Sequence, residues 1–182
     1  HYMLVKNVRL FSRDFSEIKK LYKSAFPPNE TYPLEILTLM TLRKQLIFRA
    51  FYDDETLCGF IYYCLADQTI YVSYLAINGA IRGKGYGTKL INWLLETYPE
   101  KQIVLNVEPL DENAPNYDQR QKRVRFYERN GFYLTPHRLK EPGGEYATMA
   151  NKGKLPTQNF KKVMSVFSWG LFDPIIEQDA TG

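Results

Sequence analysis

The feature that most restricts the fold is the segment YLAINGAIRGKGYGTKLINWLLETYP, residues 74–99. It begins as an apolar run typical of a buried strand and continues as an amphipathic helix that Pro99 ends. Between them lie three glycines in five residues, beside the cations Arg82 and Lys84. Glycine permits turns that other residues resist, and a helix N-terminus attracts anions. The segment therefore predicts a strand–loop–helix unit that can hold a phosphate group.

Known phosphate-binding patterns fit this loop to different degrees. A nucleotide P-loop is rejected, because the spacing before Gly-Lys is one residue short and a glycine replaces the required Ser or Thr. A dinucleotide fingerprint is also one residue short, although Glu108 ends the next apolar run as that pattern requires. The pattern R-x-x-G-x-G is filled by Arg82, Gly85 and Gly87. For this motif alone, an ordinary tight turn with solvated cations remains the alternative.

Composition restricts the class of protein only loosely. A chain of 182 residues that is 45% hydrophobic suits one domain, expected over residues 3–182, with His1 and Tyr2 interpreted as a cloning remnant before Met3. The net charge of +4 fits a small anionic ligand as well as a nucleic acid. We find no signal peptide, and no apolar run reaches the ~18 residues of a membrane span.

The two cysteines indicate a reducing compartment. Cys58 and Cys64 lie on one expected strand, where six residue steps span roughly 20 Å. A disulfide permits only ~4.4–6.8 Å between Cα atoms, so they cannot pair with each other. We interpret them as reduced core thiols of a cytoplasmic protein.

Hydrophobic periodicity predicts an α/β protein, with a mixed and mostly antiparallel sheet that has helices on both faces. The final pair of strands and the closing helix carry no recognisable motif. The expected elements are a strand (4–11), two helices (13–26 and 33–44), a meander of three strands (45–53, 57–66 and 69–78), a helix (86–98), a strand (102–109), a helix (117–130), two strands (131–139 and 145–152) and a closing helix (157–169).

A second motif stands in RVRFYERNGFYL, residues 123–134. There a helix carrying Phe126-Tyr127 runs into Gly131-Phe132 and a strand. Preceded by R-x-x-G-x-G, with one apolar strand between, it resembles the GCN5-related N-acetyltransferases (GNAT), which pair these two motifs in this order. The resemblance covers about residues 57–134. It implies the acyl-CoA N-acyltransferase fold and transfer of the acetyl group of acetyl-CoA to a primary amine of a small molecule or peptide.

The resemblance also assigns contacts to acetyl-CoA. In the family, the strand before the loop diverges from its neighbour, exposing backbone groups to the pantetheine arm, and the loop amides hold the pyrophosphate. Many members carry an asparagine where this chain has Arg120, so either Arg120 or Arg123 approaches a CoA phosphate or both lie on a solvated basic helix face. The residues expected to contact acetyl-CoA are Leu75, Ala76, Ile77, Arg82, Gly83, Lys84, Gly85, Tyr86, Gly87, Thr88 and Asn106.

The implied reaction is direct attack of an amine on the thioester, which needs a base, oxyanion donors and a proton for the departing thiolate. A strand N–H near Ala76 or Ile77 is the expected oxyanion donor. Tyr127 is the expected general acid, since the family places a tyrosine there, although it could simply pack in the core. The base is expected to be Glu108, at a strand end, or Glu30, in the loop FPPNETYP where the family builds its acceptor pocket; either could be an ordinary surface acid.

Other functions stay open at this point. The same fold could bind acyl-CoA as a sensor without turnover. The basic run RQKRVRFYER suggests nucleic acid, but an internal glutamate and the low net charge argue against it. With His137 as the only native histidine, we expect no metal site. We expect no membrane partner and either a monomer or a homodimer; the acceptor carries no readable motif.

Overall fold

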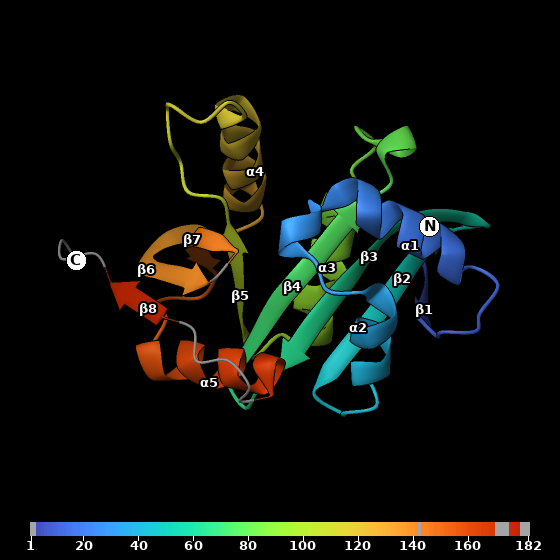
Figure 1. Ribbon diagram of the computed structural model, residues 1–182, viewed down its shortest axis with the longest axis horizontal. Helices are drawn as coiled ribbons and strands as arrows, with labels where there is room; N and C mark the ends of the chain where they lie inside the picture. The colour runs from blue at the N-terminus through green and yellow to red at the C-terminus, as the bar shows by residue number, and fades with distance from the viewer. Residues whose placement is uncertain (1–2, 142, 170–174, 179–182) are drawn as a thin grey trace. The chain divides into compact units, whose positions relative to one another are not determined.

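A computed structural model describes residues 3–141, 143–169 and 175–178 (Figure 1). These residues form two compact units: unit 1 comprises the chain up to residue 64 together with 73–99, and unit 2 comprises 65–72 and the chain from residue 100 onward. The strands are hydrogen-bonded in the order β1-β2-β3-β4-β5-β7-β6-β8. Strand β4 (Thr69–Ile77) contributes its first half to unit 2 and its second half to unit 1. The expectation of a single domain stays a prediction.

Unit 1 confirms the predicted order of elements. Strand β2 pairs antiparallel with both β1 and β3, and β4 follows β3 in the sheet, as the predicted meander requires. Its elements are β1 (Leu4–Asn7), α1 (Phe15–Ala25), the 3₁₀ turn η1 (Pro28–Glu30), α2 (Leu34–Met40), β2 (Leu46–Asp53), β3 (Thr56–Leu65), the second half of β4, the 3₁₀ turn η2 (Gly79–Ile81) and α3 (Tyr86–Thr97).

Helices cover both faces of the unit 1 sheet. Since alternate residues of β3 face opposite ways, this strand packs against helices on both sides. Phe60 lies against Tyr22 of α1, with ring centroids 6.3 Å apart. Tyr63, an odd number of residues away, instead meets Trp93 of α3 at 6.3 Å. Figure 1 shows α1 and α2 on one side of β2–β4 and α3 on the other. Each fully buried large side chain contributes about 1.5–3 kcal/mol of transfer free energy, which makes this aromatic core the main stabilising feature of unit 1.

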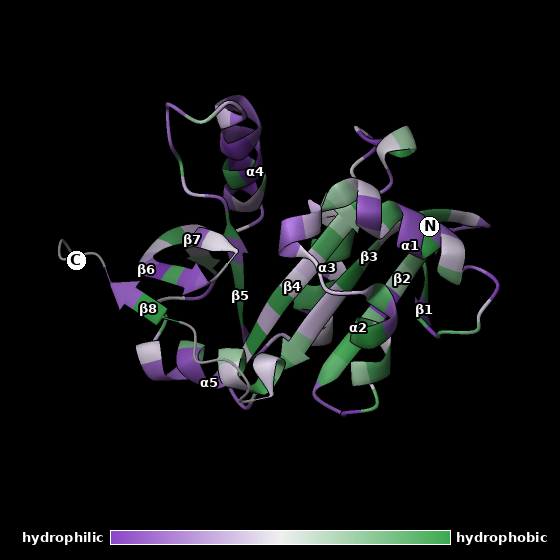
Figure 2. Ribbon diagram, viewed as in Figure 1, coloured by the Kyte–Doolittle hydropathy of each residue, from purple (hydrophilic) through white to green (hydrophobic). Residues whose placement is uncertain are grey.

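Unit 2 is built on the buried strand β5. Its central residues, Ile103 to Leu105, are buried, and Figure 2 shows β5 as mostly hydrophobic whereas α4 is mostly hydrophilic. The second of the two predicted late strands pairs with β5, so β7 lies between β5 and β6. The remaining elements are β5 (Gln102–Val107), α4 (Tyr117–Arg129), β6 (Tyr133–Glu141), β7 (Gly144–Ala150), α5 (Thr157–Ser168) and β8 (Ile175–Gln178).

Three elements differ clearly from the sequence prediction. Strand β1 ends at Asn7 rather than at residue 11. Helix α2 ends at Met40, four residues early, because Thr41 leaves the helical pattern: its N–H bonds to two preceding carbonyls and its hydroxyl donates to the Thr38 carbonyl, 2.6 Å away. Strand β8 was not predicted, since four residues are too few to establish an alternating pattern.

The thiols of β3 agree with the sequence prediction. Cys58 and Cys64 are both buried, and neither forms a disulfide. Burial raises the pKa of the Cys64 thiol to about 12, so this thiol stays protonated. Across the described ranges, no helix combines the length and apolar character needed to cross a bilayer.

A buried histidine joins α5 to the sheet of unit 2. His137 on β6 is only 2% exposed, and its Nε2 lies 3.0 Å from the Thr157 hydroxyl at the start of α5. Its Nδ1 is buried without a hydrogen-bond partner among the described residues, and its ring packs edge-on against Phe160. Burial lowers the pKa of His137 below its ordinary value of 6.5, because an imidazolium cannot be solvated there.

We predict that the free energy of unfolding falls as the pH drops below 6.5, because the unfolded chain then binds a proton that folded His137 resists. Above this pH the contribution of His137 is constant. Chemical denaturation at pH 7.5 and 5.5 measures the slope, and His137→Gln should reduce it. An equal slope in wild type and variant would show that other groups cause it.

Candidate active site

One edge of the second half of β4, the open edge, forms no strand ladder among the described residues. The parallel ladder between β4 and β5 runs from Thr69–Gln102 to Val72–Leu105 and, in the described chain, ends there. Strand β4 itself continues to Ile77. The sequence predicted backbone groups for a ligand at Leu75, Ala76 and Ile77, and all three lie beyond the end of this ladder.

The opposite edge of the same segment is held tightly against β3. The N–H of Asn78 donates to the Cys58 carbonyl at 2.8 Å, and its side-chain amide donates to the Leu57 carbonyl at 2.9 Å. Gly59 permits this approach, because a Cβ there would lie 2.3 Å from the Ala76 carbonyl oxygen. Sequence analysis missed Asn78; the only available signal was an asparagine between a strand and a glycine turn.

The glycine loop leads directly into the N-terminus of α3. Gly83 and Gly85 have φ angles of +83° and +77°, a left-handed conformation that favours glycine. Gly85 is the N-cap residue and provides no side-chain cap, so the first amides of α3 point out of the helix without an intrahelical acceptor. Arg82, Lys84 and Lys89 are exposed beside them. The loop therefore presents amide donors and positive charge to one region.

The Tyr86 side chain anchors the glycine loop and does not add to its group of amide donors and cations. Its hydroxyl donates to Asp53 Oδ2 at 2.7 Å, linking the first residue of α3 to the end of β2. The Asp53 carboxylate raises the pKa of Tyr86 to about 12, since ionising the phenol would break this bond. Tyr86 can thus contribute its amide to a ligand while its side chain fixes the start of the helix. Sequence analysis did not identify Asp53, because the two residues are far apart in the chain.

An aromatic cluster places the early loop of unit 1 next to β4. Tyr74 packs edge-on against Tyr22 on α1 and against Phe26, the residue that follows α1, at centroid distances of 5.3 and 5.0 Å. Its hydroxyl donates to the Glu30 carbonyl oxygen at 3.3 Å. The Glu30 side chain is half-buried and forms no ion pair with another described residue. The backbone of Glu30 is therefore hydrogen-bonded to the residue that precedes Leu75.

In unit 2, Tyr127 is a buried residue on α4. It is 8% exposed, and its ring packs against Phe126 and Phe132 at centroid distances of 5.1 and 5.7 Å. Burial raises its phenol pKa to about 12, partly opposed by the charge of Arg123. In the part of the chain that is described, no group hydrogen-bonds to its hydroxyl, so the proton remains available to a ligand.

Glu108 is held in a cluster of hydrogen bonds at the end of β5. Its Oε2 accepts from Arg120 Nη2 at 3.0 Å and from Asn116 Nδ2 at 3.1 Å, and its Oε1 lies 3.6 Å from Arg123 Nη1. Arg120, 19% exposed, also donates to the Pro109 carbonyl at 2.8 Å. Arg120 therefore does not lie on a solvated face but clamps the loop between β5 and α4. Its approach to a CoA phosphate stays a prediction.

The Asn106 side chain is also committed within the sheet. Its Nδ2 donates to the Tyr71 hydroxyl at 3.1 Å, and its Oδ1 accepts from the Thr148 hydroxyl at 2.9 Å on the adjacent strand β7. Its expected contact with the cofactor stays a prediction. No group of three or more His, Cys, Asp or Glu side chains in the described ranges is arranged to hold a metal ion.

The fold is a mixed sheet in which a glycine loop with left-handed residues leads from β4 into a helix without a side-chain cap. The chain belongs to the acetyltransferase (GNAT) family, which matches residues 15–132. It is 37% identical over 107 residues to YjbC of Bacillus subtilis (strain 168), which is provisionally named an acetyltransferase. That match covers 57% of this chain and 53% of YjbC, so the chain spans about half the length of this curated relative.

Solved structures share the fold. A GNAT-family protein of Bacteroides thetaiotaomicron, also provisionally named an acetyltransferase, has a TM-score of 0.74 at 24% identity, with coverage of 93% of this chain and 99% of that one. Arabidopsis thaliana Naa50, in complex with the bisubstrate analogue CoA-Ac-MVNAL, has a TM-score of 0.61 at 18% identity, with coverage of 83% and 99%. At these identities the likeness concerns the fold alone.

We predict that Gly85→Ala lowers the affinity for CoA by about tenfold or more, because the strained loop no longer directs its amides to one point. Gly153→Ala is the matched control: Gly153 has a nearly equal φ of +76°, and an added Cβ meets nothing within 4 Å at either position. Both variants should lose about 1–2 kcal/mol of stability from backbone strain. Calorimetric titration with CoA measures the affinity of each variant. Equal affinities of Gly85→Ala and Gly153→Ala would contradict binding of CoA by the glycine loop.

Proposed function

We propose that this chain is an acetyl-CoA-dependent N-acetyltransferase that transfers the acetyl group to a primary amine in a ternary complex. The observation that carries the proposal is the unit formed by β4, the left-handed glycines and the uncapped N-terminus of α3, in a chain of the GNAT family. The amides of residues 82–88 would hold the pyrophosphate, with the helix dipole and the exposed cations attracting its charge. The CoA-containing complex of Naa50, which shares this fold, supports the same ligand class.

The open edge of β4 supplies the oxyanion donor in this proposal. Since the N–H of Asn78 points toward β3, and successive residues of a strand direct their amides to opposite edges, Leu75 and Ile77 point theirs away from β3. Ala76 has its carbonyl against Gly59, on the β3 side. Of the two expected donors, Ile77 is therefore favoured over Ala76. Its amide would stabilise the tetrahedral oxyanion as the C–N bond forms.

Tyr127 would assist the departing thiolate. A phenol with a pKa of about 12 stays protonated at neutral pH and can donate a hydrogen bond to sulfur. Because a thiol has a pKa near 8.5, complete transfer of the phenolic proton is unfavourable. Tyr127 would therefore stabilise the thiolate as the C–S bond breaks. The proton that the amine releases balances the one that CoA finally takes up.

The structure favours Glu30 over Glu108 as the base. Glu108 would have to give up a bond from Arg120 or Asn116 before it could accept a proton from the ammonium. The Glu30 carboxylate forms no ion pair with another described residue, and the Glu30 carbonyl accepts a hydrogen bond from Tyr74, which precedes Leu75 on β4. It would accept the amine proton directly or through water.

We predict release of CoA thiol from acetyl-CoA in the presence of a panel of amines and peptides. Tyr127→Phe should lower kcat by about 10²-fold or more while the dissociation constant for acetyl-CoA stays the same. The control is Tyr117→Phe on the same helix, whose hydroxyl is engaged by Gln121 at 3.0 Å. Binding without thiol release across the panel would favour the sensor alternative, and undiminished turnover in Tyr127→Phe would remove its role.

We further predict that Glu30→Gln lowers activity whereas Glu108→Gln mainly lowers stability. Glu30→Gln should lower kcat by about 10²-fold and flatten the acidic limb of its pH profile, because the base is lost. Glu108→Gln should instead cost about 1 kcal/mol of stability, through its partly exposed ion pairs, and keep the shape of the profile. The reverse pattern would restore Glu108 as the base.

A further inference from the structure

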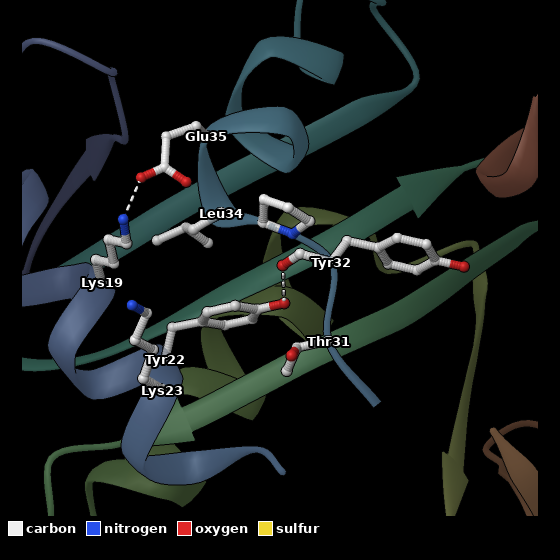
Figure 3. Close-up of a pocket in the computed structure, with 8 residues that line it drawn as sticks. Lys19, Tyr22, Lys23, Thr31, Tyr32, Leu34 and Glu35 are labelled. Atoms are coloured by element: carbon white, nitrogen blue, oxygen red, sulfur yellow. Dashed lines mark hydrogen bonds and ion pairs between the residues drawn. The ribbon is translucent and has the colours of Figure 1, made fainter. Parts of the chain in front are cut away.

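A pocket of about 300 Å³ opens between α1 and the start of α2, entirely within unit 1 (Figure 3). Its floor includes the buried Tyr22, whose hydroxyl donates to the Tyr32 carbonyl oxygen at 2.8 Å. Its polar wall is formed by Lys19, Lys23 and Glu35. This volume is at the lower end of the range for small-molecule sites, which suits a ligand of amino-acid size.

The pocket lining has two lysine side chains and only one carboxylate, that of Glu35. Lys19 and Lys23 lie one helical turn apart on α1, and Figure 3 shows both side chains along that wall. Glu35 pairs with Lys19, whose hydrogen bond is the largest cause of the lowered pKa of Glu35; the charge of Lys23 also contributes. Lys23 has no ion-pair partner among the residues that the structure describes. One ammonium group therefore remains available to an anion.

Two packed tyrosine rings connect the pocket with the second half of β4. Tyr22 lines the pocket and also packs edge-on against Tyr74, which directly precedes Leu75. The loop that carries Glu30 connects α1 to the pocket residues Thr31 and Tyr32. An amine held near Glu30 could thus belong to a small molecule whose other end lies in this pocket.

We propose that the pocket selects acceptors that carry an anionic group, a carboxylate or a phosphate, close to the reacting amine, and that Lys23 binds this group. The inference rests on the proposed acetyltransferase function and specifies its substrate class. The free ammonium of Lys23 supplies a charge-assisted hydrogen bond, with Lys19 adding to the field. A neutral or dicationic amine of similar size gains no such bond and is a poorer acceptor.

Matched pairs of acceptors test the proposal. Amino acids are compared with their carboxamides, and phosphoethanolamine with ethanolamine, by the rate of CoA thiol release. We expect kcat/KM to be about tenfold higher or more for the preferred anionic member, through a lower KM. The two pairs identify which anion is preferred. Equal values within both pairs would overturn the proposal and leave the acetyltransferase function standing.

Variants identify the residue responsible. Lys23→Gln should abolish the preference by lowering kcat/KM only for the anionic member, whereas Lys23→Arg should retain it. Lys20→Gln is the matched control, an exposed lysine of the same helix that does not line the pocket. A preference that survives Lys23→Gln would show that the anion binds elsewhere.

Glu35→Gln distinguishes this proposal from binding of an ammonium group by the pocket. Removing the carboxylate frees Lys19, so the preference for anionic acceptors should increase. If Glu35 instead held the ammonium of the acceptor, the same change would lower kcat/KM for both members of each pair, and the proposal would be wrong.

A binding measurement makes the test independent of turnover. The melting temperature of the CoA-loaded protein is recorded with each amino acid and its carboxamide, and again for Lys23→Gln. The anionic member should raise the melting temperature more in the wild type and equally in the variant. If no thiol is released but this difference appears, the acetyltransferase function fails while the anion site stands. No difference would overturn the site.

Discussion

The attachment of β4 to β3 is the constraint on which the candidate site depends. Beyond Val72 the ladder with β5 has ended, so β3 and the Asn78 hydrogen bonds are what keep this segment extended. A Cβ at Gly59 would collide with the Ala76 carbonyl and loosen that attachment. An open edge provides a binding surface only if the other edge is fixed, since unpaired backbone otherwise gains by folding onto itself. The same attachment fixes the start of the glycine loop.

Aromatic packing connects β4 to the segment between α1 and α2, where the proposed acceptor site lies. Tyr22 and Tyr74 link α1 to β4. The Tyr74 hydroxyl donates to the carbonyl of Glu30, the last residue of η1, and the Tyr22 hydroxyl donates to the carbonyl of Tyr32 in the loop that follows. This loop would otherwise be free to move, because its Pro and Thr residues form no helix or strand after Glu30. The two bonds to rigid tyrosines hold Glu30 and the pocket against the sheet.

The sequence predicted elements and motifs that depend on local pattern. The glycine loop, the order of strands and helices, and the free thiols of β3 are confirmed, because periodicity, glycine spacing and strand geometry are properties of neighbouring residues. The bond from Tyr86 to Asp53 and the place of β7 between β5 and β6 join distant segments and leave no local pattern. Glu108 shows the same limit: its place after a strand suggested a base, and no local pattern indicated that two arginines from α4 hold its carboxylate. Its role as the base stays a prediction.

The cations of this chain divide into neutralised and available groups, which a net charge of +4 cannot reveal. Arg120 and Arg123, two of the five cations in the basic run of α4, are partnered by Glu108. The cations of the loop are exposed beside uncapped amides, and Lys23 faces a pocket whose single carboxylate is taken by Lys19. Interactions between exposed charges decay over about 8–10 Å at ordinary salt, so each available cation acts on what lies next to it. Recognition of a pyrophosphate by the loop and of a small anion by the pocket would therefore be independent local events, and either could change by substitution without altering the other.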